Sequence, residues 1–280
     1  FRIGIVLFFG LLPSSVIFSS VTFREPWQGL FFLLFVYWAV RLRKRPGILV
    51  FSFMLMSAFC MALLHNGLKA FAVYLILISI YWGIVARKNG VSRARFVKFL
   101  FAGLLVFCVI MLTQKMGWFA NVEHILGEVE MFRKQAASIH GRATYGIVLD
   151  TSSVLGFVKT ISIIFVQYMF TPFPWQVENV KDIYAMLESM LRFVLLFSAL
   201  SSWRRSSVEV RSYYGFMLVV FIGMELMWAL GTINWGTAIR HHLPAYSVIV
   251  LLGAPGLILF MRRLHFEMFG CRKDNTMPLK

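Results

Sequence analysis

The sequence predicts an all-α fold, a polytopic integral membrane bundle of about eight spans with one further interfacial or re-entrant segment. Two observations predict it. Apolar residues make up 59% of the 280 residues and charged residues only 14%, whereas soluble domains carry about 25% charged residues. Apolar runs that approach the roughly 20 residues needed to cross a bilayer also recur along the whole chain. We therefore expect one polytopic membrane domain.

The expected spans are separated by short polar segments. They cover approximately 3–21, 27–40, 47–64, 68–86, 97–113, 185–203, 213–230 and 246–261. The first five form an N-terminal membrane region over 1–113, and the last three form a C-terminal one over 185–261. Between them we expect an extracytoplasmic region over 114–184, and after them a basic cytoplasmic tail over 262–280. Because the chain begins with Phe1 and no signal peptide precedes the first run, we expect it to be part of a longer protein.

The net charge of +16 comes largely from basic clusters between the apolar runs. The positive-inside rule places such clusters in the cytoplasm, so they indicate membrane orientation and not a nucleic-acid partner. The clusters are Arg41, Arg43, Lys44 and Arg45; Arg87, Lys88, Arg93, Arg95 and Lys98; Arg204, Arg205 and Arg211; and Arg262, Arg263, Arg272, Lys273 and Lys280. The three cysteines are widely separated and show no C-x-x-C spacing, so we expect no metal site and no cofactor.

The apolar run at 154–171 can be interpreted in two ways. If it crossed the membrane, Arg204 and Arg205 would lie outside; if it does not, all four basic clusters lie inside with eight spans. Lys159 in its middle favours the second interpretation, as does the Pro-containing segment 171–175 at its end, because two close prolines cannot continue a helix. We expect this run to lie on the outer surface or to dip into the membrane and return.

The segment 121–134 is predicted to be an amphipathic helix in the interface plane. Asn121 is a plausible N-cap, and Glu130 can pair with Lys134 four residues later. The apolar face at helical spacing consists of Val122, Ile125, Leu126, Val129 and Phe132. The alternative interpretation is that the charged residues of this helix form an ordinary solvent-exposed face.

Two polar segments carry the candidate site. The first, 140–146, places His140 and Arg142 among glycines that permit close approach of a ligand, and Arg suits bidentate recognition of phosphate. The second, 231–244, is predicted to be a loop between two outer span ends, with Arg240 beside His241 and the following histidine. His can serve as acid or base near neutral pH. Both segments could equally be ordinary structural loops.

Ionisable residues within the spans are a further candidate set, because they are costly in a membrane. Glu188 and Arg192 are four residues apart and are expected to pair on one helix. Glu225 has no basic neighbour in the sequence and is the better functional candidate. Trp175, in a Pro-Phe-Pro-Trp segment, could form an aromatic platform for a sugar or an interfacial anchor.

The order of three motifs resembles a known family. Gly-Arg-Ala-Thr-Tyr, an apolar stretch ending Phe-Thr-Pro-Phe-Pro-Trp, and Asn-Trp-Gly-Thr-Ala-Ile-Arg-His-His-Leu-Pro resemble the later part of bacterial polysaccharide-assembly membrane proteins: Wzy-type O-antigen polymerases, O-antigen ligases and related lipid-linked-sugar glycosyltransferases. The resemblance covers about 140–250. It implies a bacterial inner membrane and an outer loop whose Arg and His residues engage an undecaprenyl-pyrophosphate-linked glycan. Glu25 stands alone in the early outer loop where many GT-C mannosyltransferases carry a pair of acidic residues.

We therefore expect a glycan polymerase or glycosyltransferase that acts on polyprenyl-diphosphate-linked saccharides at the extracytoplasmic face, with membrane lipid and other cell-envelope assembly proteins as partners. The expected catalytic residues are His140, Glu225 and His241, and the expected substrate-binding residues are Arg142, Arg240, Trp175 and Trp235. The alternatives are a transporter or flippase for an anionic lipid or sugar, in which Glu188, Arg192 and Glu225 form a relay, and a scaffold subunit.

Overall fold

The computed structural model describes residues 2–11, 15–16, 24–85, 122–138, 143–145 and 147–268. Every regular element in these ranges is a helix, and one isolated β-bridge joins two loops. The helices are α1 (Arg2–Gly10), α3 (Glu25–Lys44), α4 (Ile48–Leu63), α5 (Asn66–Val85), α7 (Val122–Ser138), α8 (Val154–Phe170), the 3₁₀ helix η1 (Pro174–Gln176), α9 (Val180–Arg205), α10 (Val208–Gly231) and α11 (Trp235–Met268). The all-α prediction is confirmed for this part of the chain.

Four of the described helices, α5, α9, α10 and α11, are long and apolar enough to cross a membrane. This supports the predicted membrane protein. The helices α4 and α8 are apolar but shorter. The predicted span at 97–113 lies outside the described residues. Within the predicted span at 3–21, the described helix α1 has nine residues, about 14 Å at 1.5 Å per residue, which by itself is too short to cross. Residues 12–14 and 17–21 of this predicted span lie outside the described residues.

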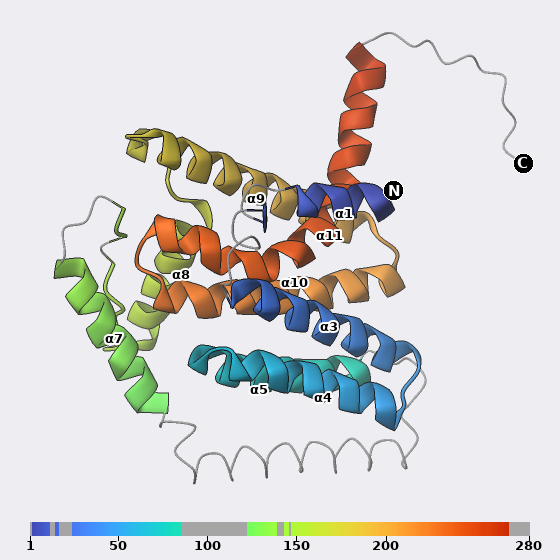
Figure 1. The fold of residues 1–280 in the computed structure, drawn as a ribbon, viewed down its shortest axis with the longest axis horizontal. Coiled ribbons are helices and arrows are strands. Elements are labelled where there is room, and N and C mark those ends of the chain that lie inside the picture. The colour runs from blue at the N-terminus through green and yellow to red at the C-terminus, as the bar shows by residue number, and fades with distance from the viewer. Residues whose placement is uncertain are drawn as a thin grey trace, which may run out of the picture.

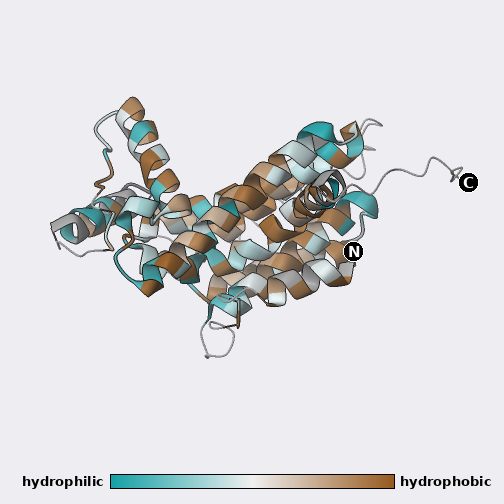
Figure 2. Cartoon of the chain, turned by 90° about the horizontal axis from the view of Figure 1, so that it is seen from above, coloured by the Kyte–Doolittle hydropathy of each residue, from teal (hydrophilic) through white to brown (hydrophobic). Residues whose placement is uncertain are grey.

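The long helices lie side by side along one direction. Figure 1 shows α3, α4, α5, α9, α10 and the first part of α11 in this arrangement, with α7 at one end of the bundle. Figure 2 shows hydrophobic residues along the bundle and hydrophilic ones concentrated towards its two ends. This distribution is typical of helices that pass through an apolar layer.

Basic residues gather at one end of the bundle, which we call the basic end. Arg43 at the end of α3 donates a hydrogen bond to the carbonyl of Trp82 near the end of α5, 3.1 Å away. Trp82 in turn donates through its indole N–H to Ser212 at the start of α10, 3.0 Å away. The clusters that follow α3 and α9 therefore lie at the same end, as the prediction of a common side requires.

The opposite end, which we call the loop end, holds the chain on both sides of α8. The backbone N–H of Tyr145, before α8, donates to the carbonyl of Ile233 at 2.8 Å. Asp182, after α8, accepts a hydrogen bond from the indole N–H of Trp235 at 3.2 Å. The chain before α8 and the chain after it therefore both contact the segment 233–235 at the loop end.

The helices α9 and α11 pack most closely, because small residues face each other there. A Cβ added at Gly253 would lie 2.4 Å from the carbonyl oxygen of Leu195, so only glycine permits this approach. The hydroxyl of Ser198 donates to the Gly253 carbonyl at 2.8 Å. This contact fixes α11 against α9 below the candidate site.

The prediction of a loop over 231–244 is wrong, because α11 begins at Trp235 and includes Pro244. Proline removes one helical hydrogen bond, but packing against neighbouring helices keeps α11 helical on both sides of Pro244. A Cβ at Gly29 of α3 would lie only 3.4 Å from the Pro244 Cα, so the two helices are in close contact at this point. Arg240, His241 and His242 consequently project from a helix in three different directions.

Candidate functional site

The two polar segments singled out in the sequence are adjacent in the structure. Thr144 and Asn234 form the isolated antiparallel bridge, and the backbone N–H of Trp235 donates to the carbonyl of Ala143 at 3.2 Å. His140 and Arg142 lie outside the described residues.

The two tryptophans predicted to bind substrate differ in exposure. Trp235 is 5% exposed and holds α11 against α9 through its hydrogen bond to Asp182. Trp175 is 79% exposed and stacks on Phe173, with ring centroids 4.9 Å apart and an interplanar angle of 17°. Of these two tryptophans, Trp175 is the one that presents an exposed aromatic face of the kind that a sugar can stack on.

Arg133 of α7 is a residue whose role the sequence did not reveal. Its charge was expected on a solvated face, but the side chain is 1% exposed. Its guanidinium donates to the carbonyls of Ile147, Ala229, Leu230 and Thr232 at 3.0–3.2 Å. Three of these carbonyls belong to the last turn and C-cap of α10, where a helix lacks backbone donors and favours a cation.

The buried position lowers the pKa of the Arg133 guanidinium to about 10, with desolvation as the cause and Tyr145 opposing it. Arg133 therefore remains charged at neutral pH. The same helix carries the predicted pair of Glu130 and Lys134, which is present. Hydrogen bonds from Lys134 and then Thr151 lower the pKa of the Glu130 carboxyl.

Arg240 lies at the loop end and contacts an acidic residue from α3. Its Nε is 3.1 Å from Oε1 of Glu25, whose side chain is 1% exposed, while that of Arg240 is 31% exposed. The Nε of Arg24 is 4.0 Å from the same oxygen. Glu25, which stands alone in the sequence, is thus bordered by two guanidinium groups, and the three side chains together carry one positive charge.

A cavity of about 300 Å³ lies between α1, α3 and α11, next to this charged group. It is lined by Phe9, Gly10, Ser15, Pro26, Gly29, Leu30, Leu33, Leu243 and Ser247. Arg240, Leu243 and Ser247 follow at three- and four-residue spacing and share one face of α11. The charged group therefore stands at the loop end of a mainly apolar cavity. Two buried hydroxyls in its wall, Ser15 and Ser247, lack a hydrogen-bond partner among the described residues.

His241, a predicted catalytic residue, is 7% exposed. Its Nδ1 is 2.7 Å from the hydroxyl of Thr232, and its ring stacks on Trp228 with centroids 4.2 Å apart. These contacts join the end of α10 to the start of α11. In this structure the side chain supports the helix connection.

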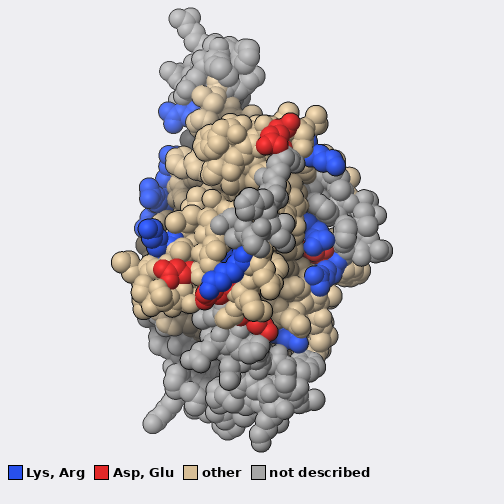
Figure 3. Space-filling view, turned by 90° about the vertical axis from the view of Figure 1, so that its left-hand side faces the viewer, with Lys and Arg blue, Asp and Glu red and all other residues tan. Residues whose placement is uncertain are grey.

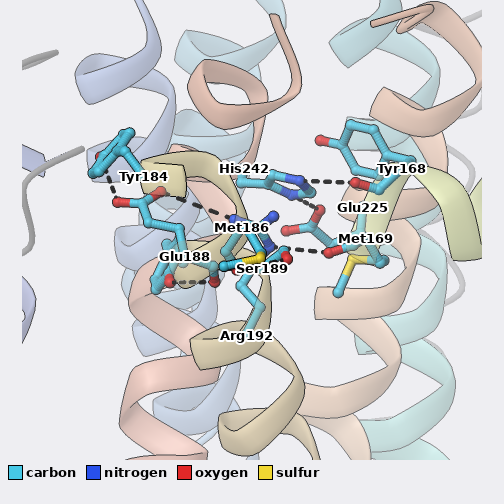
Figure 4. Close-up of polar contacts among 10 residues, drawn as sticks. Tyr168, Met169, Tyr184, Met186, Glu188, Ser189, Arg192, Glu225 and His242 are labelled. Atoms are coloured by element: carbon cyan, nitrogen blue, oxygen red, sulfur yellow. Dashed lines mark hydrogen bonds and ion pairs between the residues drawn. The ribbon is translucent and has the colours of Figure 1, made fainter. Parts of the chain in front are cut away.

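Glu225, the other described residue predicted to be catalytic, has a buried partner that the sequence analysis did not identify. Its Oε2 is 2.6 Å from Nδ1 of His242, and both side chains are at most 1% exposed. The other ring nitrogen of His242, Nε2, is 3.2 Å from the carbonyl oxygen of Tyr168 in α8. Figure 4 shows this chain of contacts across α8, α10 and α11.

The predicted pair of Glu188 and Arg192 lies beside Glu225 and His242. Nη1 of Arg192 is 3.9 Å from Oε2 of Glu188, and Oε1 of Glu188 accepts a hydrogen bond from Tyr184 at 2.6 Å. The Arg192 guanidinium lies between the carboxylates of Glu188 and Glu225 (Figure 4). We call the four side chains Glu188, Arg192, Glu225 and His242 the buried polar cluster.

Charged side chains at the loop end occur in small groups. Figure 3 views this end and shows basic and acidic side chains as neighbours in several of the groups. Arg24, Glu25 and Arg240 form one such mixed group. Among the described residues, no three His, Cys, Asp or Glu side chains lie close enough to hold a metal ion.

Comparison with known proteins does not assign this chain to a family. No family model, curated protein sequence or solved structure matches this chain.

Proposed function

We propose that this chain is a bacterial inner-membrane protein that transfers saccharide units from a polyprenyl diphosphate to an acceptor glycan at the loop end of the bundle. The observation that carries the proposal is the apolar cavity with a positively charged group at its outer end. A polyprenyl chain suits apolar walls, and a diphosphate suits guanidinium groups that donate two parallel hydrogen bonds each.

In this proposal Arg240 neutralises the diphosphate. As the bond between the sugar carbon and the diphosphate oxygen breaks, negative charge develops on that oxygen, and a cation already in place stabilises it. Arg142 is the second expected cation, because the next residue in the sequence, Ala143, accepts a hydrogen bond from the backbone N–H of Trp235 in α11. The acceptor hydroxyl must lose a proton as it attacks. His140, two residues before Arg142, is the proposed acceptor of that proton. Glu225, although predicted to be catalytic, is buried and paired with His242.

A specific observation favours a second function, transport of an anionic lipid or sugar. The buried polar cluster lies inside the bundle and not at its surface, and buried ionisable groups within membranes are typical of ion and proton relays. Glu188, Arg192 and Glu225 were expected to form such a relay. The same charged group at the loop end would then bind the cargo.

One experiment distinguishes the two functions. The purified protein in detergent is supplied with a polyprenyl-diphosphate-linked oligosaccharide, and the products are separated by length. Transfer forms longer glycans and releases polyprenyl diphosphate without any sealed compartment. A transporter leaves the oligosaccharide unchanged in detergent and moves it only across the wall of a closed vesicle.

The proposed orientation has eight spans, with the basic end in the cytoplasm and the loop end outside. Single cysteines at positions 142 and 240 should react with an impermeant thiol reagent in intact cells. Cysteines at 43, 93 and 205 should react only after the membrane is permeabilised. Labelling of position 205 from outside would refute the eight-span orientation.

A further inference from the structure

The carboxyl end of α8 is held by side chains from two other helices, and the sequence explains why. The last helical hydrogen bond joins the N–H of Thr171 to the carbonyl of Gln167 at 3.0 Å. The next carbonyl, that of Tyr168, would need a donor at position 172, but Pro172 has no N–H. The carbonyl of Met169 would need the N–H of Phe173, which instead donates to the side chain of Gln176 at 2.8 Å.

Both carbonyls accept hydrogen bonds from the buried polar cluster. Nε2 of His242 is 3.2 Å from the Tyr168 oxygen, and Nε of Arg192 donates to the Met169 oxygen at 3.2 Å. A buried carbonyl left without a donor would be costly. The docking of α8 therefore depends on the protonation of the His242 ring, because a carbonyl can only accept and Nε2 must carry a hydrogen.

The contact between His242 and Glu225 then holds one proton. With Nε2 protonated, Nδ1 and the carboxylate oxygen at 2.6 Å share a single hydrogen, whichever atom it is bonded to. If that hydrogen were lost, a carboxylate would face a ring-nitrogen lone pair and the two would repel. A second hydrogen would leave a net positive charge in an apolar interior.

We propose that Glu225 and His242 form a proton-binding site inside the helix bundle, and that the single proton they share keeps the carboxyl end of α8 docked against α9, α10 and α11. The site's ligand is a proton, and its occupancy is coupled to the position of α8. This proton-binding site lies in the interior of the bundle, and the inference does not depend on the proposed glycan transfer.

The surrounding charges fit a site that holds one shared proton. Arg192 and Glu188 of α9 balance each other, so the cluster is neutral only when Glu225 and His242 share one proton. The other titratable groups that face the site are Tyr168 of α8, whose ring lies 4.2 Å from that of His242, Tyr246 and His241 of α11, and Tyr145 before α8. Tyr246 donates to the backbone of Glu188 at 3.5 Å and His241 contacts Thr232, so neither replaces the shared proton.

The test follows the position of α8 as pH changes. The full chain, with its three cysteines replaced by serine, carries nitroxide labels at Val158 of α8 and Leu251 of α11, which are 52% and 45% exposed, and is reconstituted in lipid bilayers. At neutral pH we expect one distance between the labels. At alkaline pH, where the shared proton is lost, we expect a second, longer distance.

Glu225→Gln is the decisive variant. The glutamine amide can donate to Nδ1 of a neutral His242 without any shared proton, so the single distance should persist at alkaline pH. Glu130→Gln, a change of one carboxylate on α7 outside the cluster, should respond to pH as the wild type does. The proposal is overturned if the wild type keeps one distance throughout, or if Glu225→Gln gains the second distance at the same pH. If the Glu225→Gln protein fails to insert, the change in label distance with pH in the wild type alone decides whether the proposal holds.

Discussion

If the chain carries out the proposed transfer, replacing Arg240 with alanine should lower the rate of transfer per inserted protein on the order of a hundredfold. A charge-assisted hydrogen bond made mainly to the departing diphosphate stabilises the transition state by about 3 kcal/mol. Arg240→Lys keeps the charge but loses the planar fork, so it should also impair transfer, though less. The measurement is the length distribution of polymer in a deletion strain complemented with each variant.

The contact with Glu25 calls for a second comparison. Arg240→Ala also removes a cation from a carboxylate that is 1% exposed. A buried charge without its partner destabilises the fold, which lowers abundance independently of any role in binding. The double variant Glu25→Gln with Arg240→Gln removes both charges. If Arg240 serves only to neutralise Glu25, the double variant should recover wild-type polymer; if it binds diphosphate, the defect should persist. A wild-type distribution of polymer lengths in both Arg240→Ala and Arg142→Ala would show that neither residue takes part in the transfer.

Replacing Arg133 with methionine should release α7 from the bundle. Methionine retains most of the apolar stem but leaves four carbonyls without their charged donor, and hydrogen bonds to charged groups contribute about 1.5–3 kcal/mol each, non-additively. We expect a loss of about 3 kcal/mol, which corresponds to hydrogen exchange of the α7 amides on the order of a hundredfold faster. The measurement is hydrogen exchange followed by mass spectrometry on the protein in detergent.

The neighbouring residue provides the matched control. Lys134→Met makes the same kind of change at a side chain that is 60% exposed and pairs with Glu130. Exposed ion pairs contribute less than about 1 kcal/mol, so exchange in α7 should rise less than about fivefold. Equal exchange rates in Arg133→Met and the wild type would show that the four hydrogen bonds do not hold α7.

The helices of the bundle were predictable where apolar runs end at clear polar boundaries. The runs at 47–64 and 68–86 correspond closely to α4 and α5. The start of α11 was missed because Gly231, the polar residues after it and Pro244 all suggest a loop. Burial of Trp235 and His242, together with the close packing of Gly29 on Pro244, outweighs those local preferences. Tertiary contacts of this kind do not appear in a single sequence.

The candidate site was partly predictable. Glu225 was identified because a carboxylate within a span needs a partner, yet the partner was not found. A signal was present: Glu225 lies six residues before Gly231, and His242 lies seven after Trp235. In two antiparallel helices joined by a short turn, residues equally distant from the turn face each other. Arg133 gave no such signal, because its acceptors are backbone carbonyls, which any sequence provides.

The buried polar cluster also bears on how the chain enters the membrane. Helix α9 carries Glu188 and Arg192 on one face and so brings its own counter-charge. Helix α10 brings only Glu225 to the cluster, and the proton donor that stabilises it, His242, is on α11. A nascent chain that ended after α10 would hold the Glu225 carboxylate in the membrane without its partner, which is unfavourable. The last two helices are therefore best accommodated by the bilayer as a hairpin, inserted together.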